Sequence, residues 1–162
     1  MNIFRDMINY VGIANSEDYP ETPICFKQFT LNEKINVPEQ KPDIEQILKV
    51  MSIVKIINKR LIKTPYNKKI IIDGVVKQIF VYTAATPEQS VHSFNNEIHF
   101  CEMIIIDNEV NEDLKQLKIK IVVEDIHVFH HDLRNIQVSK VLCAIIEFDH
   151  YLPPPHYDEE EE

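Results

Sequence analysis

The sequence predicts an all-β fold, an antiparallel β-sandwich or barrel-like domain of about six or seven strands. Two observations carry this prediction: segments rich in Ile and Val recur between residues 24 and 148, and turn-forming residues separate them. A third observation, the scarcity of glycine, excludes other classes of fold, since only Gly12 and Gly74 occur in 162 residues. Phosphate-binding loops and dinucleotide fingerprints need several glycines at fixed spacing, so the sequence argues against both.

Six segments carry the strand pattern, through alternation of apolar residues or through β-branched content. They are residues 24–38, 51–64, 70–84, 91–106, 117–129 and 136–148. Gly74 marks a candidate bulge inside one of them. Long strands with few helices between them argue against a parallel βαβ sheet.

An amphipathic helix is expected over residues 1–12, with Gly12 as its terminator. The apolar residues that fall at helical spacing there are Ile3, Phe4, Met7, Ile8 and Val11. A second helix, of about two turns, is expected from Asp43, because Asp43 and Gln46 resemble a capping box ahead of an apolar face. The expected domain is thus mainly β, with one inserted helix and an N-terminal helical arm.

Three regions are expected along the chain: an arm and linker at residues 1–23, a β-domain at 24–150, and a tail at 151–162. The arm either folds back on its own domain or docks on a neighbouring subunit. The tail contains three consecutive prolines and ends in five acidic residues. Together with the apolar residues of the arm, Tyr151 and Tyr157 are candidate assembly contacts.

The net charge of −9 includes the five acids of residues 158–162. An acidic surface repels phosphate groups, so neither nucleic acid nor an anionic membrane is an expected partner. Asn2, Arg5 and Asp6 interrupt the apolar residues of the N-terminus, so no signal peptide is predicted. The protein is expected to be made in the cytoplasm and to stay there or to be deposited on a surface assembled inside a cell.

The densest group of candidate metal ligands is His127, His130, His131 and Asp132. On a regular strand His127 and His130 point to opposite faces, because they are an odd number of residues apart. A surface or loop role is therefore favoured over a metal site, and no metal or cofactor is expected.

Two further groups contain residue types that serve in catalysis. Glu97, His99 and Cys101 alternate onto one strand face, but neighbours two apart on a strand are separated by about 6.6–7 Å, too far for direct hydrogen bonds. Glu124 and Asp125 are adjacent and face apart on a regular strand, so they do not share a cleft. We therefore expect no enzymatic activity and assign no catalytic residue.

The sequence has three cysteines, Cys25, Cys101 and Cys143, and this odd number with wide spacing gives neither a zinc motif nor a closed disulfide framework. The favoured interpretation is that all three are buried, reduced thiols. The alternative is that one of them forms an intermolecular cross-link in a durable assembly.

Residues 25–50, 89–106 and 122–148 together resemble one family, the spore coat structural (SPOCS) domain of clostridial spore-formers. The most specific element is PEQKPDIEQILKV at residues 38–50, followed by VEDIHV at 123–128 with an arginine and a closing strand after it. The resemblance implies a β-rich structural module without catalytic residues, used in the outer protein layers of the spore. Better-known members carry several copies and a LysM module, whereas this chain has one copy and no room for LysM.

The resemblance therefore predicts a small structural subunit of the spore envelope, in the coat, the exosporium or an appendage. It would associate with itself, as a homo-oligomer, lattice or filament, through its β-domain and terminal arms, and other coat proteins are possible partners. The alternative is a binding module that recruits a coat protein or a glycan. Such a module needs an exposed aromatic groove, for which the candidates are Tyr82, Phe94 and Phe129.

Overall fold

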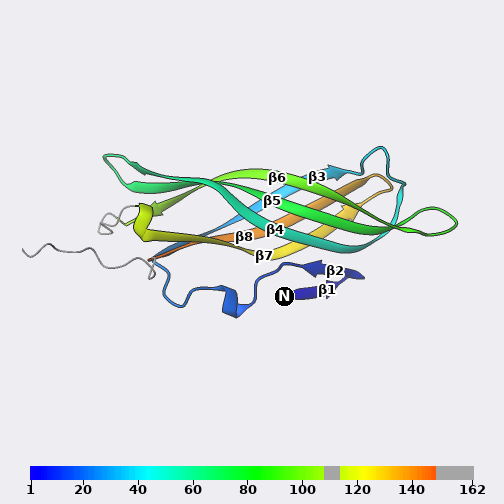
Figure 1. Cartoon of the computed structure of the whole chain (residues 1–162), viewed down its shortest axis with the longest axis horizontal. Helices are drawn as coiled ribbons and strands as arrows, with labels where there is room; N and C mark the ends of the chain where they lie inside the picture. Colours follow the sequence, from blue (N-terminus) through cyan, green and yellow to red (C-terminus); the bar gives the residue numbers. More distant parts are fainter. Residues whose placement is uncertain (108–113, 149–162) are drawn as a thin grey trace, which may run out of the picture.

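The computed structural model describes residues 1–107 and 114–148, whose eight strands form two sheets packed face to face (Figure 1). The five-stranded sheet contains, in order, β1 (Asn2–Arg5), β2 (Ile8–Val11), β4 (Ile44–Lys63), β5 (Lys68–Ala84) and β6 (Val91–Ile106). The three-stranded sheet contains β3 (Cys25–Asn36), β8 (Asn135–Phe148) and β7 (Leu117–His131). The sandwich form of the all-β prediction is therefore confirmed.

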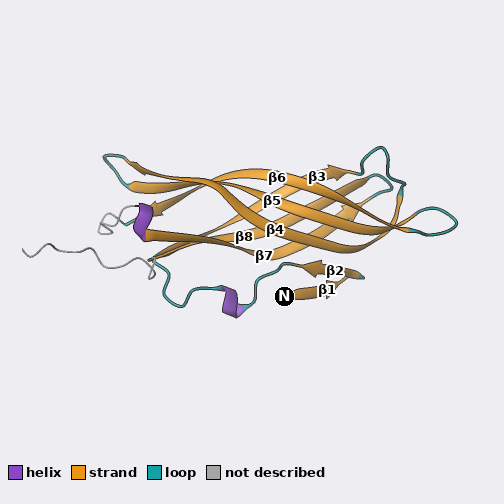
Figure 2. Cartoon of the chain, in the orientation of Figure 1, coloured by secondary structure: helices purple, strands orange, loops and turns teal. Residues whose placement is uncertain are grey.

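The six predicted strands correspond to β3 through β8, and each pairs antiparallel with its long neighbours. Figure 2 shows that helix in the described residues is limited to two short 3₁₀ turns, η1 (Ser16–Asp18) and η2 (Leu114–Gln116). Neither coincides with an expected helix. One pairing is parallel, that of β2 with β4, so the sheet is not wholly antiparallel.

The helix expected from residue 43 is wrong, because this segment is the start of β4. Register irregularities at Glu45 and Leu48 each insert one residue into the strand. As a result the buried residues Ile44, Ile47 and Val50 follow one another at intervals of three rather than two. Three-residue spacing is also the signature of one helix face, and this explains the incorrect prediction.

The N-terminal helix is also wrong, because residues 1–12 form a β-hairpin. Asp6 and Met7 link β1 to β2 with φ values of 51° and 67°, as in a two-residue hairpin turn. A helix of three turns is marginal on its own, whereas β2 gains hydrogen bonds from the edge of β4. Ile8 and Tyr10 then alternate into the core, and Tyr10 is only 1% exposed.

The core lies between the two sheets, and aromatic rings join them on the side where β3 approaches β6. The rings of Phe29 and Phe100 lie 5.3 Å apart between centroids. Gly74, which pairs with Phe100 across the sheet, makes room for this ring, since a Cβ there would lie 2.4 Å from it. Gly74 pairs in register, and the neighbouring bulge lies opposite it in β4, at Ile57.

After β2 the chain crosses from the five-stranded to the three-stranded sheet. Gly12 makes the crossing with a φ of 102°, and a Cβ there would lie 2.3 Å from the Ser52 carbonyl oxygen. Ile13 then bridges Val123 of β7, and the Ala14 N–H donates to the Val123 carbonyl at 2.7 Å. One short segment therefore contacts the edges of both sheets.

Residues 13–24 continue over the outer face of the three-stranded sheet and form a strap. The Tyr19 hydroxyl donates to the Glu124 carboxylate at 2.6 Å, and its ring packs on a small apolar cluster of Val122, Cys143 and Ile145. The strap ends where the Ile24 N–H donates to β8 and β3 begins. The linker expected between arm and domain is thus packed on the domain.

The N-terminal hairpin also satisfies the exposed backbone of β7. The Tyr10 hydroxyl accepts from the Val128 N–H at 2.9 Å, while the Arg5 guanidinium donates to the Ile126 carbonyl. Arg5 also pairs with Asp125 at 3.1 Å. An edge strand with unpaired N–H and C=O groups invites pairing with other chains, and the hairpin blocks this part of β7.

Gly12→Ala is expected to lower the free energy of unfolding by about 2 kcal/mol or more, because alanine disfavours the positive φ and its Cβ meets a backbone carbonyl. Urea denaturation measures the change. The exposed strand substitution Ser93→Ala serves as the control and should change stability little. Equal stability of Gly12→Ala and the wild type would show that the crossing does not constrain the fold.

Candidate functional site

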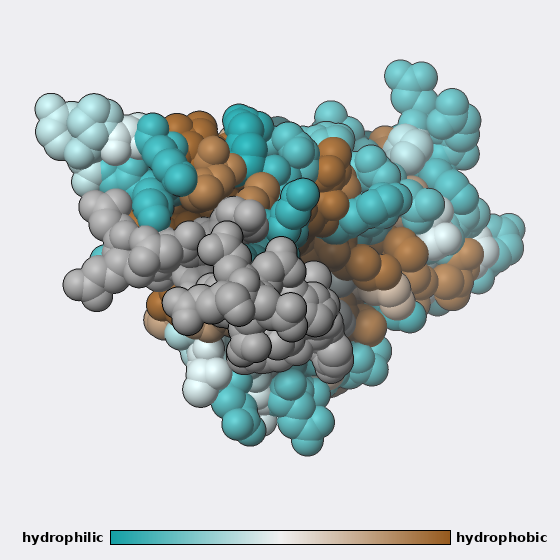
Figure 3. All heavy atoms as spheres, turned by 60° about the vertical axis from the view of Figure 1, so that its left-hand side comes forward, coloured by the Kyte–Doolittle hydropathy of each residue, from teal (hydrophilic) through white to brown (hydrophobic). Residues whose placement is uncertain are grey.

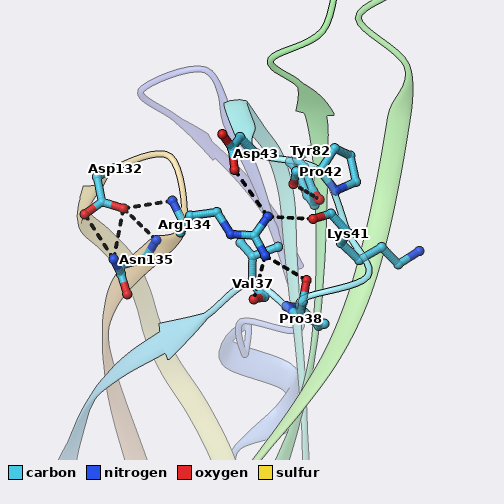
Figure 4. Close-up of polar contacts among 9 residues, drawn as sticks. All are labelled: Val37, Pro38, Lys41, Pro42, Asp43, Tyr82, Asp132, Arg134 and Asn135. Carbon is cyan, nitrogen blue, oxygen red and sulfur yellow. Dashed lines mark hydrogen bonds and ion pairs between the residues drawn. The ribbon is translucent and has the colours of Figure 1, made fainter.

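Arg134, in the turn between β7 and β8, ties together the loops at one end of the sandwich (Figure 4). Its guanidinium donates to three carbonyls and one carboxylate, those of Val37 (3.2 Å), Pro38 (2.9 Å), Lys41 (2.6 Å) and Asp43 (3.3 Å). The planar fork of arginine supplies five N–H donors and so can serve converging acceptors. We call this arrangement the Arg134 clamp.

The clamp holds the connection between β3 and β4, which passes from one sheet to the other. Backbone hydrogen bonds reinforce it: the Val37 N–H donates to the Arg134 carbonyl and the Ile44 N–H to the Leu133 carbonyl, both at 2.8 Å. The segment at residues 38–50 and the later arginine, singled out in the sequence, therefore meet in the fold. Their role at this end is to position chain segments.

Asp132 shapes the turn that carries Arg134. Its carboxylate accepts from the backbone N–H of Arg134 at 2.8 Å and of Asn135 at 2.7 Å. These hydrogen bonds lower the pKa of Asp132, because they favour the charged carboxylate. Asp132 is therefore occupied in the turn and is not a spare ligand beside the histidines.

His127 and His130 were expected on opposite faces of a strand, but the bulge at Phe129 places both on the outer face of the three-stranded sheet. They pair there with Ser139 and Gln137 of β8. Even so, no group of three or more His, Cys, Asp or Glu side chains within residues 1–107 and 114–148 could hold a metal ion.

A second bulge changes the expected geometry of Glu124 and Asp125. The irregularity falls at Glu124, whose carboxylate accepts from Tyr19 and from the Gln28 amide at 2.9 Å. Asp125 pairs with Arg5 instead. The two acids therefore do not face apart as on a regular strand. Glu124 is held by the strap and by β3, and Asp125 is held by the N-terminal hairpin.

Glu97, His99 and Cys101 do share one face of β6, as expected, and this face is exposed. The Cys101 thiol hydrogen-bonds the Asp73 carboxylate of β5, and this contact raises the pKa of Cys101. A raised pKa leaves less thiolate, which is the nucleophilic form. The geometry thus offers no activated nucleophile at this position.

The three cysteines are free thiols with different exposure. Cys143 is buried under the strap, and burial raises its pKa to about 11. Cys25 is half-buried, and burial raises its pKa as well. Cys101 is exposed, so the expectation of three buried thiols is wrong for this residue.

The candidate assembly residues of the N-terminal hairpin divide between core and surface. Ile8 is buried, while Ile3 and Val11 are partly buried. Phe4 and Met7 point outward and are 69% and 65% exposed. Tyr151 and Tyr157 lie outside the described residues.

The aromatic residues proposed for a binding groove are mostly inaccessible. Tyr82 and Phe94 are buried, and the Tyr82 hydroxyl donates to the Pro42 carbonyl at 2.7 Å. Phe129, at the bulge of β7, is exposed. An aromatic groove built from all three residues is therefore ruled out.

Hydrophobic side chains remain exposed on the outer face of the five-stranded sheet and along β4. Figure 3 shows brown hydrophobic residues lying between teal hydrophilic ones on the surface it presents. The most exposed on β4 and β6 are Ile53, Ile57, Val91 and Ile105. In residues 1–107 and 114–148, no helix has the length and apolar character needed to span a membrane.

A group missed by sequence reasoning lies between the sheets. Lys140 of β8 is 0% exposed, and its ammonium donates to the Glu33 carboxylate of β3 at 2.5 Å and to the Gln78 side-chain oxygen of β5 at 2.8 Å. The Gln78 amide also donates to Glu33 and, at 3.1 Å, to Asn96 of β6. This buried polar network joins four strands from both sheets.

Burial lowers the pKa of Lys140 below its ordinary value of 10.5, because desolvation penalises the ammonium, and the hydrogen bond to Glu33 opposes the shift. A buried charge is tolerated only when it is paired and hydrogen-bonded. Sliding one sheet against the other would leave the Lys140 ammonium or the Glu33 carboxylate without its hydrogen-bonding partners. The network therefore fixes how the sheets are aligned.

Lys140→Met should destabilise the protein by about 3–5 kcal/mol, because it leaves the Glu33 carboxylate buried without its cation. Adding Glu33→Leu should recover most of that loss, since an apolar pair of similar size is close to neutral. Urea denaturation of both single variants and the double variant gives the coupling energy. Additive losses would mean that the two residues act independently.

The same residue should introduce a pH dependence. The folded pKa of Lys140 is lowered, so the unfolded chain binds more protons in the window between that pKa and 10.5. The contribution of Lys140 to stability should therefore rise as the pH rises toward 10.5. The difference in unfolding free energy between wild type and Lys140→Met, followed from neutral to alkaline pH, measures this. A difference that does not vary with pH would contradict the prediction.

Arg134→Ala should cost about 2 kcal/mol, because several hydrogen bonds to a charged donor are lost. Arg134→Lys should recover only a minor part, since a single ammonium cannot reach the separate carbonyls of the clamp. Arg60→Ala is a matched control: its exposed ion pair with Asp73 should contribute less than about 1 kcal/mol. Full rescue by lysine would reduce the clamp to a simple charge effect.

Comparison with protein families gives one match: the model of the SipL, SPOCS domain family matches residues 43–130, just over half of the chain. No curated protein matches the chain, and no solved structure matches it. The matched region runs from the clamp residue Asp43 to the end of β7. It supports a sporulation-related protein, in a family not known as enzymatic. The resemblance seen in the sequence is thus confirmed, and the chain belongs to the SipL SPOCS domain family.

Proposed function

We propose that this protein is a non-enzymatic structural subunit of the spore envelope that associates with copies of itself. The observation that carries the proposal is the family match, because it connects the chain with sporulation. The proposed location is the coat, the exosporium or a spore appendage.

The strand edges support self-association. Within the described residues, β3 pairs only with β8 and β6 pairs only with β5, so each strand has one edge without a neighbouring strand. Lys27 bridges part of this side, since its ammonium donates to the Met103 carbonyl at 2.9 Å and pairs with Glu102 at 3.1 Å. The rest of both edges offers backbone groups to a neighbouring subunit.

The N-terminal hairpin supplies a second contact surface. The turn presents Met7 to solvent beside Phe4, while Ile8 and Tyr10 anchor the hairpin in the core. Exposed apolar side chains on a rigid element suit a subunit interface, because the backbone that carries them is already ordered and loses little conformational entropy on binding. Arm residues and strand edges would thus act together in assembly.

The exposed thiol of Cys101 fits a supporting role in a durable assembly. It lies on the outer face of the five-stranded sheet, whereas Cys143 is shielded by the strap. Among the three cysteines, Cys101 is therefore the candidate for an intermolecular disulfide.

A binding module that recruits a coat protein or glycan is the second candidate. A shallow groove of about 250 Å³ beside the strap favours it, lined in part by Tyr19, Pro20 and Phe26. The ring of Phe26 is exposed there. An aromatic surface of this kind suits a proline-rich peptide or a sugar ring better than a charged ligand.

The purified protein should form larger species as its concentration rises, as measured by sedimentation velocity and negative-stain microscopy, and an antibody should detect it in purified spores. Phe4→Ser together with Met7→Ser should weaken association, whereas the control Leu133→Ser, exposed in the β7–β8 turn, should not. Cys101→Ser should remove any oligomer that a reductant dissociates. A strictly monomeric protein that is absent from spores would end the proposal.

A further inference from the structure

The charge of this acidic protein is strongly segregated. Residues 46–72 contain seven basic side chains and no acidic one, so the remaining chain carries −9 − 7 = −16. These 27 residues form most of β4, the turn after it and the start of β5. A basic ribbon on an acidic molecule favours contact with an acidic partner.

The ribbon also contains a strand edge with no neighbour in the described structure. β2 pairs with β4 only as far as Met51, because the chain turns away at Gly12. Beyond that point, residues 52–63 of β4 pair with β5 on one side alone. We call this stretch the basic edge, and its charged side chains are Lys55, Lys59, Arg60 and Lys63.

The charges of the basic edge are exposed and mostly unneutralised. Arg60 pairs with Asp73 at 2.8 Å, whereas Lys55, Lys59 and Lys63 form no ion pair within residues 1–107 and 114–148. A hollow of about 320 Å³ lies at the start of the edge, and Ile53 and the segment around Gly12 border this hollow. Its lining is partly apolar and includes Met1, Val54 and Ile121.

Lysines on an edge strand also discourage unwanted pairing, and this protective role is the simplest explanation for them. It does not explain why acids are missing from the whole ribbon, since mixed charges protect an edge equally well. Like charges would repel the β4 edge of a second copy, so edge-to-edge pairing of two basic edges is disfavoured. An acidic segment is the kind of chain that this edge attracts.

The chain carries such a segment itself. Residues 158–162 are five consecutive acids that follow Phe148, the last residue of β8, after nine intervening residues. Those nine can span up to about 30 Å when extended. Phe148 pairs with Leu117, and Figure 1 shows this end of β8 at the same end of the sandwich as the β4–β5 turn.

We propose that residues 158–162 of one copy bind along the basic edge of a second copy, with Tyr157 seated in the hollow beside Ile53. The three prolines at 153–155 favour this over binding to the same copy, because a polyproline run is extended and stiff and resists folding back. Since β8 ends at the same end of the sandwich as the β4–β5 turn, two copies can exchange tails reciprocally. Such an exchange gives a closed two-fold dimer.

This inference rests on the proposed self-association and is tested on the full chain by sedimentation velocity at low and high salt. Lys59→Glu with Lys63→Glu should raise the dimer dissociation constant at least about tenfold at low salt, and so should Glu160→Lys with Glu161→Lys. Combining all four should restore dimerisation, because the charges are exchanged. Tyr157→Ala should weaken it less than either charge reversal.

The control pair is Lys34→Glu with Lys41→Glu, which changes the net charge equally but lies on β3 and in the loop after it, away from the basic edge, and it should leave dimerisation unchanged. Self-association that ignores the tail and edge variants would overturn this inference and leave the proposed function standing. A wild type that stays monomeric at every concentration would overturn both. A third outcome is a protein that stays monomeric while its frictional ratio changes with salt and with the variants. This result would show that the tail binds the basic edge of its own copy, and it would overturn the exchange between copies.

Discussion

A lysine ammonium enclosed between two sheets constrains how the rest of this sandwich packs. Lys140 is fully buried, so Glu33 on the neighbouring strand and Gln78 on the opposite sheet must stay within hydrogen-bonding distance of it. Apolar contacts alone tolerate small shifts of one sheet over the other, since the hydrophobic effect is not directional. A buried ion pair does not, because misalignment exposes an unpaired charge to a medium of low polarity.

Segments that cross between the sheets at the margins of the sandwich also hold the two sheets together. The N-terminal hairpin and Gly12 close the side between β4 and β7, and the Arg134 clamp secures the loop from β3 to β4. Each crossing replaces a missing strand neighbour with specific hydrogen bonds. In the proposed assembly, these links would leave strand edges available only where no crossing covers them.

Alternation of apolar residues, together with β-branched content where the alternation is imperfect, predicts the six long strands, because a strand with one buried face has a period of two. The errors arose where that period is broken. Bulges at Glu45 and Leu48 produced a helix-like spacing, and the bulge at Phe129 reversed the expected facing of His130. Lys140 escaped notice for a different reason: lysine is almost always solvent-exposed, and only its even position in β8, among buried residues, marked it as inward.

Composition also concealed the basic ribbon, because net charge is a sum over the whole chain. The total of −9 describes the molecule as a whole, but salt screens exposed charges over about 8 Å at physiological ionic strength. Closer to the surface, a ligand responds to the charges next to it, and along the β4 edge those are lysines and arginine. The exclusion of anionic partners drawn from net charge therefore applies to the protein as a whole and does not extend to this edge. Strand topology is what makes the difference visible, since it shows that these side chains border an edge without a partner strand in the described residues.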